Sequence, residues 1–285
     1  MEIGREIFWN VGGGARWLTY ALMVITLIVL YVGLKKRYSM WKFAKGKCAP
    51  FDFSKRLWER IGYFIENGIF HKSIMRESFP GTMHFFIFWG FLILAIGTAL
   101  VAFQDDIVRP FFKANILQGG FYLIFSAVLD AAGLVAIIGI VMAIWRRYVT
   151  KPSRLDNKTD DAITLVWILV VLITGFLVEG ARIASTRPDF EVWSFVGWIT
   201  SYLFLGLSPD GIKITHKFFW YLHMLISFGL IAYIAYSRLI HIVTSSLNMM
   251  FRGVEDTPRG AIAPIEDFEN AEEFGINSIE NFTWR

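Results

Sequence analysis

The sequence has 285 residues, of which 55% are hydrophobic, 17% aromatic and only 18% charged. This composition is too apolar for an ordinary soluble domain. The single cysteine, Cys48, excludes a disulfide framework, an iron–sulfur cluster bound by this chain alone and covalent haem attachment, because each needs at least two cysteines. The net charge is only +4, and Lys and Arg stand in blocks between apolar runs. This pattern favours a membrane protein over nucleic-acid binding.

Five apolar segments approach or exceed the roughly 20 residues that a helix needs to cross the hydrocarbon layer. The sequence therefore predicts an all-α integral membrane protein, a bundle of five transmembrane helices. The predicted spans are Trp17–Leu34, Gly81–Phe103, Gly119–Trp145, Ala162–Gly180 and Lys217–Ile240.

A sixth stretch, Val192–Leu207, is shorter and rich in aromatic residues. We interpret it as an interfacial or re-entrant helix, because aromatic side chains collect at the headgroup level. The first span has a signal peptide as its alternative, but its apolar run is long, its leader Met1–Arg16 carries two acids and no clear small-residue cleavage site follows. We expect a retained helix.

Lys and Arg are unevenly divided between the two sides of the predicted bundle. Eleven lie in Lys35–Pro80, five in Arg146–Asp161 and four from Arg238 to the end, against eight on the other side. Cytoplasmic loops carry the excess of Lys and Arg. The N-terminus is therefore predicted outside and the C-terminus in the cytoplasm, with the chain in the cell inner membrane.

Two cytoplasmic pieces are candidates for docking a partner. Phe53–Glu66 places its apolar residues on one face of a helix, as expected of a helix lying on the membrane. We divide the chain into a transmembrane domain, residues 1–248, and an acidic tail, residues 249–285. From Arg252 onward this tail has eight acids against three bases. It either follows a partner's surface or is merely solvated.

The histidines are the first candidates for chemistry within the spans. His223 and His241 are 18 residues apart, which is five turns of a continuous helix and about 27 Å along its axis. His84 opens the second predicted span on the cytoplasmic side, where His241 closes the fifth. Two neutral imidazoles from facing helices can ligate the iron of a non-covalent haem b. Ionisable residues inside spans are functional candidates, so we predict His84 and His241 as such a pair.

Two glycines follow His84 at a spacing that suggests a groove. Gly90 and Gly97 are seven residues apart and so share one helix face. Either a flat macrocycle or another helix can approach there, and for the glycines alone close helix packing is the favoured alternative.

Three features stand out in the sequence: the motif Gly81-x-x-His84-x-x-Ile87-x-x-Gly90-Phe91, the run Ile173–Ile183 and the spacing of His223 and His241. They resemble the nitrate reductase gamma-subunit superfamily, and within it the membrane cytochrome b of heterodisulfide-reductase-type and sulfite-reduction-associated complexes. The resemblance implies a subunit that exchanges electrons between a lipid quinone, of menaquinone type, and a cytoplasmic iron–sulfur protein. The ending Glu273–Arg285 is similar to the linker that leads into an iron–sulfur domain in fused members.

One position departs from the nitrate reductase pattern. That family has a second histidine ten residues after the first one in the second span, and here the residue is Leu94. His223 therefore lacks an obvious partner. Either it ligates a second haem together with another residue, or only the inner haem exists and His223 has another role.

Three charged residues belong to the outer half of the predicted bundle: Asp130, Glu179 and Arg182. Quinone chemistry moves protons as well as electrons, so it needs a group that exchanges protons with water. We interpret Glu179 and Asp130 as candidates for this quinone and proton site. The alternative is that one of these carboxylates pairs with Arg182 or a hydroxyl and only stabilises the bundle.

The remaining polar candidates border the spans. His71 is expected at the surface, and His216 close to water near the outer side. Arg238, Arg146 and Arg147 border the inner haem level, where they either neutralise haem propionates or act only as topology-setting charges.

Three functions compete at this point. The first is an electron-transfer subunit of a membrane quinone oxidoreductase, and the alternative is a non-redox membrane anchor for a cytoplasmic redox enzyme. A transporter is disfavoured because the sequence has no internal repeat and no matched pair of broken spans. A bound chromophore discriminates between the first two.

Overall fold

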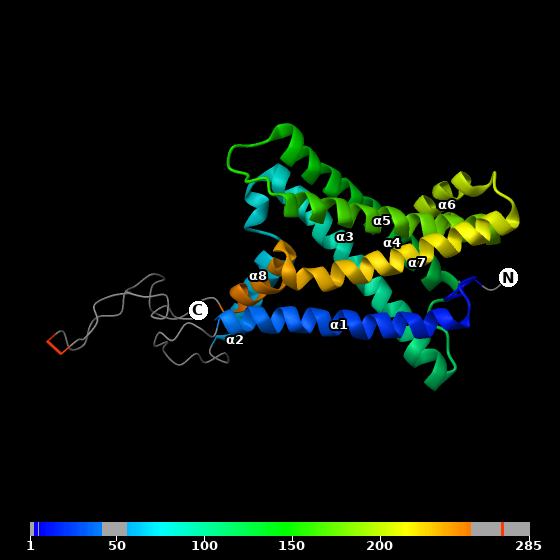
Figure 1. Ribbon diagram of the computed structural model, residues 1–285, viewed down its shortest axis with the longest axis horizontal. Helices are drawn as coiled ribbons and strands as arrows, with labels where there is room; N and C mark the ends of the chain where they lie inside the picture. Colours follow the sequence, from blue (N-terminus) through cyan, green and yellow to red (C-terminus); the bar gives the residue numbers. More distant parts are fainter. Residues whose placement is uncertain (1–2, 5, 42–55, 252–268, 271–285) are drawn as a thin grey trace. The chain divides into compact units, whose positions relative to one another are not determined.

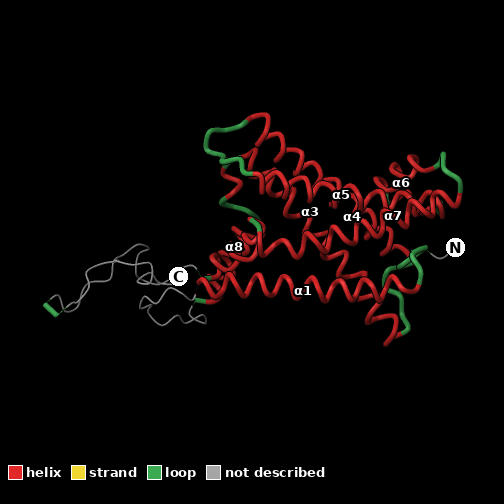
Figure 2. Tube along the Cα trace, viewed as in Figure 1, coloured by secondary structure: helices red, strands yellow, loops and turns green. Residues whose placement is uncertain are grey.

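The computed structural model describes residues 3–4, 6–41, 56–251 and 269–270. In these ranges the regular structure is helical, as Figure 2 shows. The chain divides into two units. Unit 1 contains Met1–Leu27 and Glu77–Ala232, and unit 2 contains Ile28–Arg76 and Tyr233–Arg285.

Five helices are long and apolar enough to cross a membrane, which confirms the predicted number of spans in this multi-pass membrane protein. Most extend past the predicted bounds, because helical hydrogen bonding continues into the polar residues that flank each apolar run. The helices are α1 (Gly13–Trp41), α3 (Ser78–Phe103, continued as a π-helix to Phe112), α4 (Gly119–Trp145, continued to Thr150), α5 (Thr159–Thr186) and α7 (Pro209–Tyr233, continued to Tyr236).

In unit 1, α3 packs along α4 through small residues (Figure 1). A Cβ atom added to Gly90 would lie 2.7 Å from the carbonyl oxygen and side chain of two α4 residues, Ala132 and Ala136. One added to Gly97 would lie 2.5 Å from the Leu129 side chain. The shared face of these glycines is therefore a helix-packing face, which is the alternative that the sequence favoured for them.

The predicted aromatic stretch Val192–Leu207 contains a short helix, α6 (Phe195–Ser201), as expected. A 3-10 turn, Asp189–Trp193, precedes it. α6 packs on α5, where a Cβ atom at Gly180 would lie 2.8 Å from the Thr200 side chain. The absence of a side chain at Gly180 thus allows α6 to lie directly against the C-terminal part of α5.

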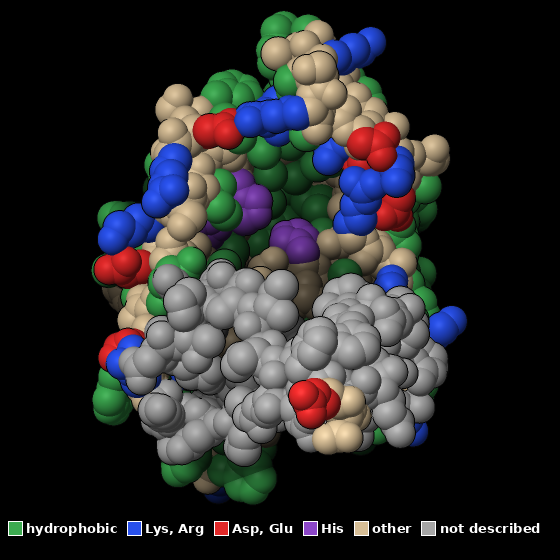
Figure 3. Space-filling view, turned by 90° about the vertical axis from the view of Figure 1, so that its left-hand side faces the viewer, with side chains coloured by type: hydrophobic (Ala, Val, Ile, Leu, Met, Phe, Trp, Pro, Cys, Tyr) green, Lys and Arg blue, Asp and Glu red, His purple; other side chains and the backbone are tan. Residues whose placement is uncertain are grey.

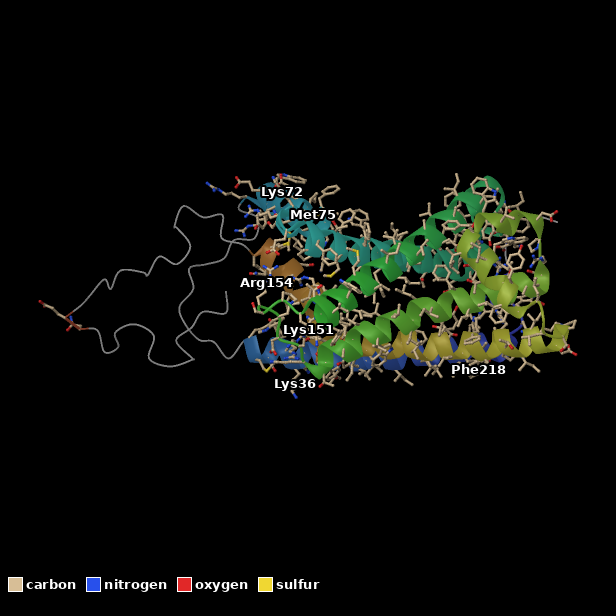
Figure 4. All side chains as sticks on the ribbon, turned by 90° about the horizontal axis from the view of Figure 1, so that it is seen from above. Lys36, Lys72, Met75, Lys151, Arg154 and Phe218 are labelled. Carbon is tan, nitrogen blue, oxygen red and sulfur yellow. The ribbon has the colours of Figure 1, made fainter. Side chains whose placement is uncertain are left out.

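The two ends of unit 1 differ in their charged groups. At one end, Lys151 and Arg154 lie in the loop between α4 and α5, whereas Phe218 lies on α7 toward the other end (Figure 4). Arg154 forms a two-pronged ion pair with Glu77, in which Nη1 donates to Oε1 at 2.7 Å. Lys and Arg side chains are numerous on the face that Figure 3 shows.

Unit 2 contains two short helices, α2 (Leu57–Phe64) and α8 (His241–Met250). They pack together, and the buried Arg60 of α2 donates from Nη1 to the carbonyl of Met250 at 3.2 Å. The predicted amphipathic helix is thus helical from Leu57 onward, while its residues 53–55 lie outside the described residues. The acidic tail, residues 249–285, also lies outside them except for residues 249–251 and 269–270.

The prediction that one helix continues from His223 to His241 is wrong. The chain leaves the helical conformation at Ser237, which is extended with φ −119° and ψ −177°. The Ser237 hydroxyl accepts a hydrogen bond from the N–H of Leu239 at 3.1 Å, and such local bonds compete with the helical ladder. The predicted span Lys217–Ile240 therefore breaks before His241, and these two histidines are not related by five turns of one helix.

Candidate functional site

A buried ion pair with two hydroxyl groups lies at the end of unit 1 where α6 packs. Arg182 on α5 donates from Nη1 to Glu191 Oε1 at 2.6 Å. Tyr122 on α4 donates from its hydroxyl to the same oxygen at 3.0 Å, and Ser194 donates to Oε2 at 3.1 Å. The Glu191 side chain is 0% exposed and that of Arg182 is 9% exposed. We call these four residues the buried ion-pair cluster.

The electrostatics of this cluster keep Glu191 ionised. Burial by itself would raise the pKa of the Glu191 carboxyl, but hydrogen bonds from Arg182, Tyr122 and Ser194 outweigh it and lower the pKa below its usual value. Charge-assisted hydrogen bonds of this kind are the strong ones. The cluster therefore holds one positive and one negative charge away from water.

The sequence reasoning missed Glu191. Its only signal was an acid placed immediately before the aromatic stretch, close in sequence to an Arg at the end of a span. The alternative to a quinone site was that Asp130 or Glu179 pairs with Arg182, but the short ion pair of Arg182 is with Glu191, and the Glu179 Oε1 atom lies 4.0 Å from Arg182 Nη2. Within the described part of the chain, Nη2 has no hydrogen-bond partner.

The two predicted carboxylates meet next to this cluster. Asp130, which is buried in α4, accepts hydrogen bonds at Oδ2 from the N–H groups of Val196 at 2.6 Å and Gly197 at 3.1 Å. The Glu179 carboxyl packs against the same glycine, since a Cβ atom at Gly197 would lie 2.7 Å from Glu179 Cδ and Oε2. The structure thus brings Asp130, Glu179 and Arg182 close to one another.

Two histidines that were expected near water are buried instead. The His216 ring packs edge-on against Trp9 and its Nδ1 lies 3.5 Å from the Asn10 side-chain nitrogen, so the N-terminal segment covers it. The His71 ring is also buried, with Nδ1 3.0 Å from the carbonyl of Ile69. Both expectations are wrong. The N-terminal segment covers His216, and the His71 ring lies against the backbone of Ile69.

His223 is held in α7 by contacts with α5. Its Nδ1 lies 3.0 Å from the Thr174 hydroxyl oxygen. The same hydroxyl lies 2.8 Å and 3.0 Å from the backbone carbonyls of Val170 and Val171. When its proton goes to one of these carbonyls, the hydroxyl oxygen accepts from Nδ1, which leaves the lone pair on Nε2. A Cβ atom at Gly175 would lie 3.3 Å from the His223 ring, so this glycine leaves room for it.

The other two predicted ligands lie in different units. His84 is half-buried on α3 of unit 1, six residues before Gly90 and therefore about 120° around the helix from the face that packs on α4. His241 begins α8 in unit 2, with Nδ1 2.8 Å from the carbonyl oxygen of Arg238. Because a carbonyl only accepts, Nδ1 carries the proton and Nε2 the lone pair. Among the described residues, no three His, Cys, Asp or Glu side chains gather as a site for a bare metal ion.

The fold and this site define a multi-pass helical membrane protein with buried charges and oriented histidines inside its spans. The family model described as nitrate reductase gamma subunit matches residues 77–255. The chain therefore belongs to the nitrate reductase gamma subunit family.

Three curated relatives show how this chain compares with larger proteins. It is 34% identical to EtfAB:quinone oxidoreductase of Syntrophomonas wolfei, over all of this chain and 40% of that protein. It is 21% identical to "Probable iron-sulfur-binding oxidoreductase FadF" of Bacillus subtilis, over 94% of this chain and 37% of that protein. It is 27% identical to a subunit of the dihydromethanophenazine:CoB–CoM heterodisulfide reductase of Methanosarcina acetivorans, over 80% of this chain and 89% of the relative. The chain thus spans about two fifths of the length of the first two.

Proposed function

We propose that this chain is a membrane cytochrome b subunit that transfers electrons between a lipid quinone, of menaquinone type, and a cytoplasmic iron–sulfur protein or fused iron–sulfur domain. Family membership supports the proposal, as do the names of the relatives, which include a quinone oxidoreductase and an iron–sulfur-binding oxidoreductase. The excess of Lys and Arg at the α4–α5 loop supports an orientation with this end in the cytoplasm and the N-terminus outside.

The orientation of His223 is the single observation that carries the proposal. A ligating histidine is typically oriented by a hydrogen bond from its other ring nitrogen, and the Thr174 hydroxyl lies 3.0 Å from His223 Nδ1, where it can accept this bond. Haem b, when bound, supplies one-electron oxidation and reduction. We assign His223 as a ligand of a second haem, on the outer side.

His84 and His241 are proposed as the ligands of the inner haem. The pairing rests on the family resemblance and on their sequence positions, both at the cytoplasmic side of a predicted span. The proton on His241 Nδ1 is consistent with ligation through Nε2. Arg238 remains the proposed partner for haem propionates, because a guanidinium binds carboxylates through charge-assisted hydrogen bonds.

Glu179 and Asp130 are proposed to line the quinone site. Both lie in spanning helices, and the buried ion-pair cluster next to them keeps Arg182 in place. A quinone carbonyl needs a hydrogen-bond donor, and the Nη2 atom of Arg182 is a buried donor directed toward Glu179. These residues would bind and orient the quinone head and exchange its protons.

The cytoplasmic partner is proposed to dock on the helix that begins at Leu57 and on the tail after Arg252. Trp58 of α2 is 81% exposed, and exposed Trp residues are enriched at protein interfaces and membrane surfaces. If deletion of the tail leaves co-purification and electron transfer with every cytoplasmic subunit intact, the tail is wrongly assigned.

Visible absorption spectra of the full chain, oxidised and then dithionite-reduced, test the haem proposal. The wild type should contain two haems per chain, His84→Ala and His241→Ala should each lose the inner haem, and His223→Ala should retain one. His71→Ala is the matched control, since this histidine is buried in unit 2 without a proposed ligand role, and it should keep both haems. A wild type without any chromophore would favour the non-redox anchor.

A conservative substitution sharpens the assignment of His223. Thr174→Val removes the hydroxyl that lies 3.0 Å from Nδ1 while keeping the side-chain shape, and loss of such a supporting group costs roughly 10–100-fold in metal affinity. Thr164→Val, at another buried threonine of α5, should leave the haem content unchanged. Equal haem affinity in both variants would contradict the ligand role. Loss of quinone-dependent haem redox change in Glu179→Gln, with haem retained, tests the quinone site separately.

A further inference from the structure

Two carboxyl groups from different spanning helices converge on one residue of α6. Asp130 of α4 accepts the N–H of Gly197 at 3.1 Å, and the Glu179 carboxyl of α5 fills the space where a side chain of Gly197 would lie. A larger residue at position 197 would displace the Glu179 carboxyl. The local backbone of α6 therefore places the two carboxyl groups side by side.

Both carboxyl groups lie in a largely buried place: Asp130 is 2% exposed and the Glu179 side chain is 18% exposed. Two ionised carboxylates held close together repel each other, because each carries a negative charge and offers only acceptors. A single proton shared by the two groups relieves this repulsion, as in other sites where two carboxyl groups share one proton.

The surrounding charges lead to the same result. The charged neighbour of the pair is Arg182 on α5, which is bound by Glu191 on the turn before α6, and Tyr122 on α4 donates to the same Glu191 carboxylate. Glu191 holds the guanidinium at 2.6 Å, whereas Glu179 lies 4.0 Å from it. The charge of Arg182 is thus matched by Glu191, and it does not compensate two further negative charges in a buried place.

We propose that Asp130 and Glu179 together hold one exchangeable proton and form the proton-transfer group of the quinone site, an inference that rests on the proposed function. Oxidation of a quinol releases two electrons and two protons. The electrons pass to the iron–sulfur partner, one proton passes to the ionised carboxyl of the pair and then to water, and the second passes directly to water. The buried Nη2 of Arg182 donates to the quinone oxygen and orients it toward Glu179.

Infrared spectroscopy of the purified full chain tests the shared proton without any quinone present. The wild type should show one protonated carboxyl band at neutral pH that shifts in heavy water and titrates as one proton. Asp130→Asn and Glu179→Gln should each remove it, because the remaining carboxyl then ionises and accepts from the new amide. Glu77→Gln, a matched change at an exposed carboxylate, should leave it in place. A wild type without this band would overturn the proposal, even if the two variants do not fold.

Quinol oxidation by the assembled complex tests the transfer role. The rate should fall by roughly 100-fold in Glu179→Gln, the scale of general acid–base catalysis, and stay unchanged in Glu77→Gln. An unchanged rate in Glu179→Gln would overturn the transfer role. Failure of the proposed function itself has a different signature, a carboxyl band that persists in a protein without haem.

Discussion

The two ends of unit 1 use the same kinds of residue in opposite environments. Arg154 and Glu77 form an ion pair with side chains more than half exposed, whereas Arg182 and Glu191 form one that is almost completely buried. Water surrounds the exposed pair, whereas the carboxylate of the buried pair also accepts a hydrogen bond from the Tyr122 hydroxyl.

This difference shows which charges the fold depends on. An exposed pair contributes little, because water screens it and both side chains lose freedom when they are held together. A buried pair gains little net stability over apolar residues of the same shape, but removing one partner leaves an uncompensated charge. The buried end should therefore be sensitive to single changes and the exposed end tolerant of them.

The largest effect is expected for Arg182→Met. This change leaves Glu191 buried without its cation, and the free energy of unfolding should fall by about 3–5 kcal/mol. Thermal or denaturant unfolding in detergent measures the loss. Arg154→Met at the other end is the control, and a similar loss in both variants would contradict the comparison.

Tyr122→Phe should have the next largest effect. It removes one donor from Glu191 Oε1 and keeps the ring, and a hydrogen bond to a charged group contributes about 1.5–3 kcal/mol. The same unfolding measurement applies, with Tyr148→Phe, at a partly exposed tyrosine after α4, as the control. A loss below the error of the measurement would show that Ser194 and Arg182 suffice for Glu191.

The double variant Arg182→Met with Glu191→Met should be more stable than Arg182→Met alone. With both charges gone, the uncompensated carboxylate no longer exists, and apolar replacements of a buried pair are often close to neutral. A double-mutant cycle gives the coupling energy directly. Simple additivity of the two single losses would show that the pair is not coupled.

The pH dependence of stability should differ between wild type and Glu191→Gln. The pKa of Glu191 is lower in the folded protein than its ordinary value of 4.5. A lowered pKa contributes stability that is present above the ordinary value and is lost as pH falls through the folded value. The wild type should therefore lose stability below about pH 4.5 more steeply than Glu191→Gln. Parallel curves would contradict the role assigned to this carboxylate.

The smallest effect is expected for Glu77→Gln. Both partners of this pair are exposed, and we expect no measurable change in the unfolding temperature at physiological salt. A clear decrease would mean that the exposed end also depends on its ion pair, and the contrast between the two ends would fail.

The candidate site was only partly predictable. Asp130 and Glu179 were identified because charged residues are rare inside apolar runs and therefore visible in the sequence. Glu191 was not, because it stands outside the spans, where acids are common. The buried state of His216 depends on Trp9 and Asn10, more than 200 residues away, and no local pattern indicates such a contact.

The sequence by itself determined the five spanning helices and the short aromatic helix α6, because each follows from a continuous run of apolar or aromatic residues. Only the tertiary structure decided which charges meet. Asp130 accepts a hydrogen bond from the backbone of α6, 66 residues further along the chain. Arg182 pairs with Glu191 although Glu179 is closer in sequence, because the turn before α6 brings the Glu191 carboxylate within 2.6 Å of the guanidinium. The end of the fifth helix was also decided there, since the hydroxyl of Ser237 takes a backbone N–H in place of the helical ladder, a competition that hydropathy does not reveal.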